Sequence, residues 1–214
     1  MSANKQIKSD VVEPKDEGDF AVLQLTYDES DAFWRRGGVP KNRNLDFLHA
    51  VIQAAFGWMN YHSYDFTKGR QSYVPDGVLA VDDEVMEKET KDTLIQTLFK
   101  RRGDKATYEY DLNDGNSVTI VCLGFCDFML EQLFAAGGQD LIEDSSAFKF
   151  TPGIVRLLTE DDRTKEAKRC REWLHESFEL SVEDVLAIPS GDDIYERVCE
   201  LIENDLEKRN ETEA

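Results

Sequence analysis

The chain has 214 residues and a formal net charge of −19, because 44 Asp and Glu residues outnumber 25 Lys and Arg residues. Hydrophobic residues make up 41% of the chain and aromatic residues 10%, which is enough to bury a substantial core and argues against wholesale disorder. A negative charge of this size repels phosphate backbones and anionic lipids, so nucleic acid is a disfavoured partner unless a local basic patch exists.

Targeting and metal-binding signals are weak. No run approaches the roughly 18 apolar residues of a membrane span, and residues 1–19 lack the apolar run of a signal peptide. We therefore expect a cytoplasmic protein without a membrane partner, and a flexible acidic tail over 1–19. Cys122 and Cys126 have the spacing of half a zinc site, but no second Cys/His pair follows at ligand spacing. The sequence thus predicts free thiols, no metal site and no cofactor.

The first predicted elements form a hairpin. Residues 20–27 alternate, with Leu23, Leu25 and Tyr27 on the face expected to be buried. Residues 32–40 follow a turn as a second short strand, in which Trp34 is assigned to the core.

A helix is predicted next. Its apolar stripe recurs at helical spacing and comprises Leu45, Leu48, Ile52 and Phe56. Asn44 is its expected N-cap and Gly57 its left-handed C-cap, with Trp58 covering the same core. His49 lies at the edge of the stripe, where we expect a backbone carbonyl to satisfy its ring.

The period then changes to two, which predicts a strand over 62–67 with His62, Tyr64 and Phe66 on one face, and a return strand over 71–74. Residues 76–92 carry seven acids and two lysines, and most of this stretch is interpreted as an exposed acidic loop. A short amphipathic helix ends before Gly103.

The clearest hairpin spans 105–123, around an Asn-Asp-Gly-Asn turn. Residues 125–136 are apolar and are interpreted as a helix ending at two glycines. Further helices are predicted over 151–158 and 161–178, after Ser181, and after Ser190.

This order predicts an α+β fold: an antiparallel or mixed sheet of hairpins packed on a central helix, with C-terminal helices. A β-grasp-like sheet is one arrangement that it allows. We expect one domain over 20–206, with the sheet in 20–124 and helices in 125–206, followed by a polar tail over 207–214.

Four stretches carry a resemblance to a known family. They are "FWRRGGVP", "LDFLHAVIQAAFGW", the "HSYDF" that follows it, and "YEYDLNDG". They resemble the Trp-Arg-Arg segment, the Leu-His-x-x-Ile-Gln-x-x-x-Gly-Trp helix, the His-x-x-x-Phe strand and the Tyr-Asp-Phe-Gly-Asp turn of the plasmid pRiA4b ORF-three-like family. Later, "AAGGQDLIEDSSAFKF" and "EWLHESFELSVEDV" match more loosely, with Ser145 and Ser146 where the family has Cys and Gly. The resemblance spans about 20–205.

The resemblance implies an α+β fold and a bacterial or archaeal cytoplasm, with no established activity. The chain departs from the pattern at Leu112 and Asn113, where Phe-Gly is usual, and at Asn116 and Val118, where Trp and His are usual. If the family has a polar site shared between that His and nearby carboxylates, this chain has lost part of it.

Five residues are candidates for a binding site: Arg35, Arg36, His62, Asp111 and Asp114. Arg35 and Arg36 are adjacent on a strand and face opposite sides, so one of them could hold a carboxylate or phosphate, or each could form a salt bridge. His62 is expected to be half-buried, with Asp111 or Asp114 as its partner, either as a structural hydrogen bond or as a ligand contact.

Three function classes remain open. The preferred one is a non-enzymatic binding module for a protein or a small ligand. The second is an accessory protein of mobile DNA, which charge and the lack of a Lys/Arg-rich recognition helix disfavour. The third is an enzyme that uses His62 with Asp111 or Asp114 as an acid–base pair. Nucleophile signatures and phosphate loops are absent from the sequence.

Overall fold

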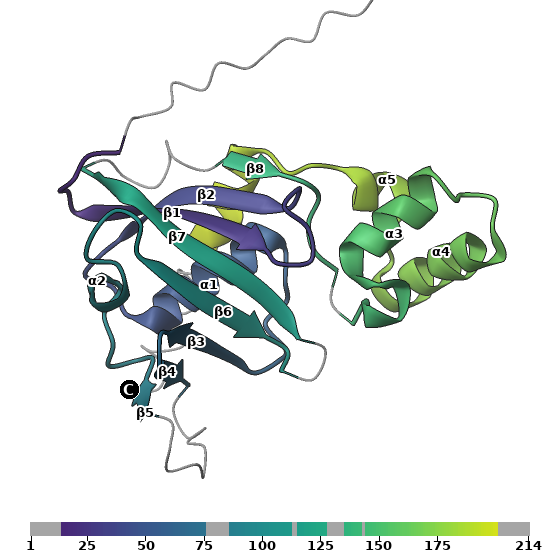
Figure 1. The fold of residues 1–214 in the computed structure, drawn as a ribbon. Helices are drawn as coiled ribbons and strands as arrows, with labels where there is room; N and C mark the ends of the chain where they lie inside the picture. The colour runs from purple at the N-terminus through teal and green to yellow at the C-terminus, as the bar shows by residue number, and fades with distance from the viewer. Residues whose placement is uncertain (1–13, 76–85, 113–114, 128–134, 143, 201–214) are drawn as a thin grey trace, which may run out of the picture.

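An eight-stranded mixed sheet forms the main body of the computed structural model, which describes residues 14–75, 86–112, 115–127, 135–142 and 144–200 (Figure 1). Its strands lie in the order β5-β4-β3-β6-β7-β1-β2-β8. Their bounds are β1 Phe20–Tyr27, β2 Trp34–Pro40, β3 Tyr64–Lys68, β4 Gln71–Val74, β5 Met86–Glu89, β6 Lys105–Tyr110, β7 Asn116–Cys126 and β8 Ala135–Gly137.

The three predicted hairpins are confirmed, because β1 pairs with β2, β3 with β4, and β6 with β7, all antiparallel. The remaining neighbours are also antiparallel except β4 and β5, which are parallel. β1 is thus antiparallel to both of its neighbours. In a β-grasp sheet, by contrast, the first strand lies at the centre and is parallel to the last strand of the sheet. The α+β class is confirmed, and the β-grasp-like arrangement does not describe this sheet.

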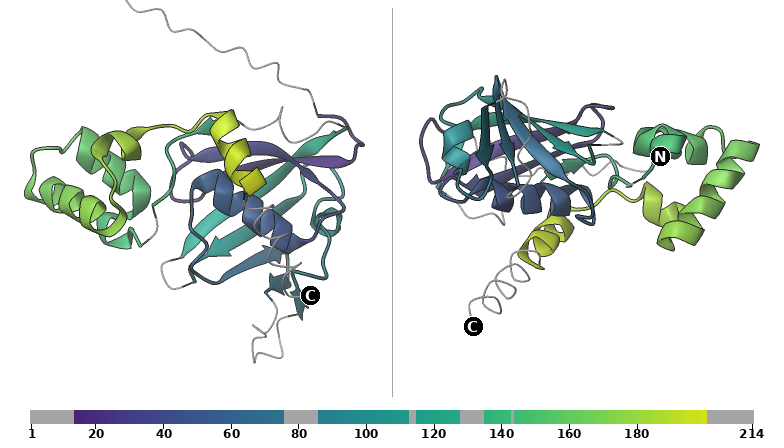
Figure 2. Two further views of the ribbon diagram at one scale, coloured as in Figure 1. Left: turned by 180° about the vertical axis from the view of Figure 1, so that it is seen from behind. Right: turned by 90° about the horizontal axis from the view of Figure 1, so that it is seen from below.

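One face of the sheet is buried and the other is polar, as the alternation along the strands predicts. Leu23, Leu25 and Tyr27 of β1 are at most 3% exposed. The helix α1, Leu45–Phe56, covers this face together with the helical residues 191–200 (Figure 2). Between them, the sheet and these helices enclose the larger of the hydrophobic clusters.

The ends of α1 are capped as predicted. The Asn44 side chain accepts a hydrogen bond from the Phe47 backbone N–H at 3.1 Å. Gly57 ends the helix with a φ of 77°, in the left-handed region that glycine adopts without a Cβ clash. The contacts at Asn44 and Gly57 therefore define where α1 begins and ends. The predicted short helix is also present as α2, Ile95–Leu98.

A separate helical lobe lies beside the sheet (Figures 1 and 2). It consists of a 3₁₀ turn at Ser146–Phe148, α3 Phe150–Thr159, α4 Lys165–Phe178 and α5 Val182–Leu186. These helices enclose a second hydrophobic cluster of their own. We call them the helical lobe, and the sheet with α1 and residues 191–200 the sheet lobe.

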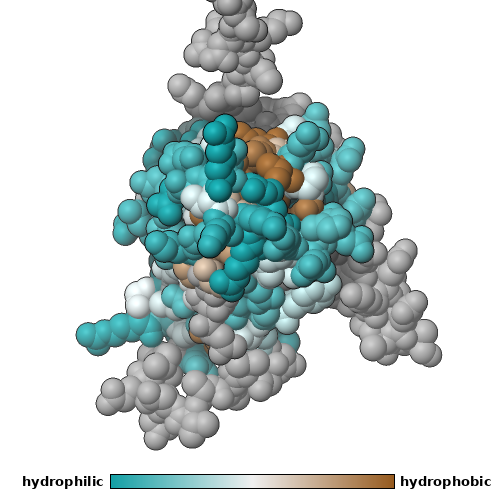
Figure 3. Space-filling view, turned by 90° about the vertical axis from the view of Figure 1, so that its right-hand side faces the viewer, coloured by the Kyte–Doolittle hydropathy of each residue, from teal (hydrophilic) through white to brown (hydrophobic). Residues whose placement is uncertain are grey.

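Two helices of the helical lobe begin at side-chain caps, of which Ser181 was predicted. Thr164 accepts from the Ala167 N–H at 3.0 Å, and Ser181 forms a capping box with Asp184. Ile194 and Val198, in contrast, are buried in the core of the sheet lobe. The C-terminal helices thus divide between the two lobes. Figure 3, which faces the helical lobe, shows hydrophobic atoms gathered in a patch within a mostly hydrophilic surface.

One predicted helix is replaced by strands. Residues 125–136 do not form the predicted helix where they are described: Phe125 and Cys126 end β7, and Ala135–Gly137 form β8. The sheet therefore extends beyond residue 124. The period of an apolar run does not distinguish a helix from a buried strand, so here the pairing with β1 and β2 decides that strands form.

In the stretch 76–92, most of which was expected to be an exposed acidic loop, Met86–Glu89 forms β5 against β4, and residues 76–85 lie outside the described residues. Within the described part of the tail expected over 1–19, Lys15 exchanges two backbone hydrogen bonds of 2.8 Å with Phe125. Residues 1–13 lie outside the described residues, and the flexibility of the tail stays a prediction. Among the helices that the structure describes, none is long and apolar enough to cross a membrane.

Candidate functional site

Arg35 is buried in β2 and bonds to the backbone. Its side chain is fully buried, and burial lowers its pKa to about 10, so the guanidinium remains charged at neutral pH. It donates hydrogen bonds to the carbonyl oxygens of Ala55 at 2.5 Å, Trp34 at 3.0 Å, Gly137 at 2.9 Å and Gln139 at 2.8 Å. Arg35 therefore joins β8 and the end of α1, and is not accessible to a ligand.

Asp140 completes this arrangement from the connection to the helical lobe. Its carboxylate lies 3.2 Å from Arg35 Nη2 and accepts from both terminal nitrogens of Arg197, at 2.8 and 3.2 Å. The salt bridge that the sequence analysis considered for Arg35 is therefore present, and the same carboxylate also binds Arg197 of the helical residues 191–200.

Arg36 faces the opposite side of the sheet, as adjacent strand residues must. Its Nε donates to Gln24 Oε1 at 3.0 Å, and its guanidinium lies 5.5 Å from the centre of the Trp34 ring. Trp34 is only partly buried on this outer face, so its assignment to the core is wrong.

His49 belongs to a buried hydrogen-bond network. Its Nδ1 lies 2.8 Å from the Tyr108 hydroxyl and its Nε2 2.7 Å from Asn60 Oδ1, while Gln53 Nε2 donates to the same hydroxyl at 2.8 Å. Burial lowers the pKa of His49 to about 4, so the ring is neutral at pH 7. Side chains, and not the expected backbone carbonyl, satisfy this histidine.

His62 lies in the loop between α1 and β3, two residues before the strand that it was expected to join. Its ring packs edge-on against Tyr110, with centroids 5.6 Å apart. It is therefore half-buried as expected, but it packs against an aromatic ring of β6 from a loop and not from the predicted strand.

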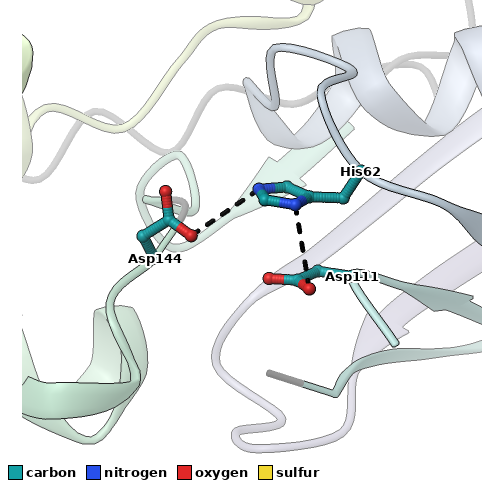
Figure 4. Close-up of side chains that lie close together, drawn as sticks. All are labelled: His62, Asp111 and Asp144. Atoms are coloured by element: carbon teal, nitrogen blue, oxygen red, sulfur yellow. Dashed lines mark ion pairs between the residues drawn. The ribbon is translucent and has the colours of Figure 1, made fainter. Parts of the chain in front are cut away.

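Two carboxylates from distant parts of the chain, those of Asp111 and Asp144, converge at His62 (Figure 4). Asp111 Oδ1 lies 3.8 Å from His62 Nδ1, and Asp144 Oδ1 lies 3.6 Å from His62 Nε2. Asp111 directly follows β6, and its side chain is 5% exposed, whereas Asp144 enters from the connection to the helical lobe and is 63% exposed. The cluster thus spans both lobes.

The predicted site residues are therefore only partly brought together. His62 and Asp111 meet, Arg35 and Arg36 lie elsewhere, and Asp114 falls outside the described residues. The sequence analysis missed Asp144, although "IEDSS" lies within the segment compared with the family's Glu-Asp-Cys-Gly-Gly run. That position was the one signal that pointed to it.

The two departures from the family pattern occupy the core. Asn116 is 4% exposed and accepts a hydrogen bond from the Tyr27 hydroxyl at 3.0 Å. Val118 is fully buried among apolar side chains and brings no polar group to the cluster.

A cleft lies between the two lobes, next to this cluster. Its inner part is a cavity of about 250 Å³ lined by Gly57, Met59, Asp140, Leu141, Ile142, Phe178, Leu180, Asp184 and Val185. Its outer part is an open hollow of about 540 Å³ lined by Met59, Tyr61, Asp144, Glu176, Ser177, Phe178 and Glu179. Both parts share Met59 of the sheet lobe and Phe178 of the helical lobe, so we call the two parts together the interlobe cleft.

Comparison with known proteins places the fold in a group without an assigned function. A crystal structure of a protein of unknown function, MM3350 from Methanosarcina mazei Go1, aligns with a TM-score of 0.56 and 22% identity, over 77% of this chain and 95% of that chain. This likeness concerns the fold. No curated protein matches the chain. The model of the plasmid pRiA4b ORF-3-like protein family matches residues 22–186. The chain therefore belongs to the plasmid pRiA4b ORF-3-like protein family, as its motifs suggested.

Proposed function

We propose that the protein is a non-enzymatic binding module whose interlobe cleft takes a short basic segment of a partner protein. The observation that carries this proposal is a cleft built from both lobes, with apolar walls and a rim of carboxylates. Apolar pockets with a few convergent polar groups are the usual form of binding sites.

The apolar part of the cleft supports a large side chain as the anchor. Leu141 and Ile142 come from the connection between the lobes, and Phe178, Leu180 and Val185 come from the helical lobe. Met59 is 48% exposed and Tyr61 75% exposed, so two large apolar side chains are open to a partner at the cleft. A buried anchor surrounded by a polar rim is typical of peptide and protein interfaces.

The charge of the rim supports a basic segment. Asp144, Glu176 and Glu179 line the outer hollow, and Asp184 lines the inner cavity. The whole chain carries −19, so its long-range field attracts cations to these carboxylates. The same field argues against the alternative of a mobile-DNA accessory protein that touches nucleic acid.

The enzyme alternative relied on His62 with Asp111 or Asp114. The 3.8 Å between His62 Nδ1 and Asp111 Oδ1 exceeds hydrogen-bond range, and no observation on the described residues favours acid–base chemistry over binding. It therefore remains a prediction that ranks below the binding module.

The test is fluorescence anisotropy with short synthetic peptides that combine Lys or Arg with one large apolar residue, beside acidic peptides of the same apolar content. We expect saturable binding of the basic set, weakened by added salt. Glu176→Lys should weaken binding at least about tenfold, or 1.4 kcal/mol. Glu172→Lys, the same charge change one turn away on α4 and outside the cleft lining, is the matched control.

A second pair of variants tests the apolar wall. Met59→Lys should abolish binding, whereas Leu94→Lys, at another exposed apolar position, should not change it. The proposal fails if no basic peptide binds, or if Glu176→Lys and Met59→Lys bind as tightly as their controls.

A further inference from the structure

We propose that His62, Asp111 and Asp144 form a binding site for a divalent transition-metal ion that links the two lobes. One ring nitrogen of His62 and one carboxylate oxygen of each Asp lie within 4.8 Å of one another (Figure 4). The inference does not depend on the interlobe cleft binding a peptide, because it concerns different side-chain contacts.

The spacing of these atoms suits ligation better than direct hydrogen bonding. The contacts of 3.8 and 3.6 Å from the ring nitrogens are longer than the 2.7–3.2 Å of a protein hydrogen bond. Metal bonds of about 2.0–2.2 Å to nitrogen and oxygen place two ligands of one ion up to about 4 Å apart. One ion can bind only one of the two ring nitrogens, whereas Asp111 faces Nδ1 and Asp144 faces Nε2. The three atoms that would share an ion lie within 4.8 Å of one another, so the side chains must approach one another when the ion binds.

Two of the three ligands are already held in position by the sheet lobe. The Asp111 backbone N–H donates to the Ser63 carbonyl at 2.9 Å, and its carboxylate is nine-tenths buried or more. The backbone N–H groups of Tyr61 and His62 donate to the Tyr110 hydroxyl, at 2.9 and 3.3 Å, which fixes the loop that carries His62.

The third ligand provides access and adjustment. Asp144 is exposed and also lines the outer hollow of the cleft, so an ion can enter from solvent. Its carboxylate can move the distance that ligation requires without disturbing a packed core. Because Asp144 belongs to the connection that leads into the helical lobe, ligation would fix that connection against the sheet lobe.

The ligand set indicates which ions fit. One imidazole and two carboxylates favour Zn²⁺, Mn²⁺ or Co²⁺, whereas Ca²⁺ prefers a larger shell of oxygen ligands. Three protein ligands leave at least one position open to water or to another ligand, as in zinc sites that are not purely structural.

The experiment is titration of chelator-treated full-length protein with Zn²⁺, Mn²⁺, Co²⁺ and Ca²⁺ by isothermal calorimetry, with Co²⁺ absorption reporting the ligand field. We expect one ion per chain for a transition metal, weaker binding of Ca²⁺, and a higher midpoint of thermal unfolding with metal. Asp144→Asn should weaken binding at least tenfold. Asp162→Asn, at an exposed position of the helical lobe outside the cluster, should bind like the wild type.

Asp144 is exposed, so its variant tests the site without the risk of unfolding that a change at buried Asp111 carries. His62→Gln provides a second test, because loss of the imidazole should shift the Co²⁺ spectrum or remove it. Absence of saturable binding by any transition metal overturns the proposal, and so does equal binding by wild type and Asp144→Asn. If Asp144→Asn lowers stability in metal-free protein and metal stabilises neither form, the cluster is an ion pair and not a metal site.

Discussion

His49 and Tyr64 stack ring on ring, with centroids 3.6 Å apart and planes 7° from parallel. The Tyr64 hydroxyl donates to Asp46 Oδ1 at 3.0 Å, one turn earlier on α1 than His49. An aromatic side chain of β3 thus lies along α1 and covers the face of a histidine whose two nitrogens are already bonded. This stacking makes His49 part of the core and fixes it in the neutral form.

Acid should destabilise the protein through His49. Its pKa is about 4 in the folded protein and about 6.5 when unfolded, so between these values the unfolded chain binds a proton that the folded chain does not. The stability that His49 contributes is therefore fully present above pH 6.5 and is lost as the pH drops towards 4, by up to about 3 kcal/mol. Urea unfolding as a function of pH measures this slope. His49→Gln keeps polar groups but does not titrate, so a variant with an undiminished slope would contradict the assignment.

Asp65→Asn should stabilise the protein at neutral pH. Asp65 is paired directly across from Glu109 on β6, and burial together with Glu109 and Glu87 raises its pKa to about 6. A raised carboxyl pKa means that stability is lost as the pH rises through it, so removing the charge gains free energy at pH 7. Because the side chain is partly exposed, we discount the gain to about 1 kcal/mol.

Denaturant unfolding of Asp65→Asn at pH 7 and at pH 4 measures this gain. The gain should shrink at pH 4, where wild-type Asp65 is already largely protonated. An equal gain at both pH values would point to packing instead of charge.

Arg35→Lys should lower the free energy of unfolding by about 2–4 kcal/mol. A lysine keeps the charge but cannot donate to the carbonyls of Ala55, Gly137 and Gln139 at once, so buried acceptors lose their partners. Arg36→Lys, on the outer face of the same strand, should change stability by less than about 0.5 kcal/mol and serves as the control. Similar costs for the two variants would mean that the guanidinium contacts do not contribute as described.

Residues 20–124 should not fold by themselves, in keeping with one cooperative domain over 20–206. Such a fragment lacks β8 and the buried side chains of Leu141, Ile194 and Val198, which complete the core over α1. Limited proteolysis checks this expectation: a stable fragment ending near residue 124 that unfolds cooperatively would contradict it.

Local patterns predicted most elements of the sheet lobe because their signals are local. The alternation of Leu23, Leu25 and Tyr27, and the cap residues Asn44 and Gly57, need only neighbouring residues to be recognised. The prediction fails where tertiary pairing decides. The apolar run from Phe125 could form a buried helix or a buried strand. Its strand partner includes Ala21, more than a hundred positions earlier in the chain, so no local pattern reports the pairing.

The candidate site shows the same limit. His62 and Asp111 were associated through the family motifs that carry them, and the structure brings them together. Asp144 belongs to a different lobe, and no periodicity reports which loop of one lobe meets which loop of another. His49 was placed correctly on the helix, but its partners Tyr108 and Asn60 depend on long-range packing.

The helical lobe leaves the sheet lobe after β8 and returns to it at residues 187–190, so both of its connections attach at one place. Gln139, on the outgoing connection, donates to the carbonyl of Leu186 on the returning side at 3.3 Å. A segment whose ends meet in this way is a cassette: its sequence can be lengthened, shortened or exchanged without changing the order of any strand in the sheet. The fold therefore gives a protein engineer a place to graft another recognition element beside the sheet lobe.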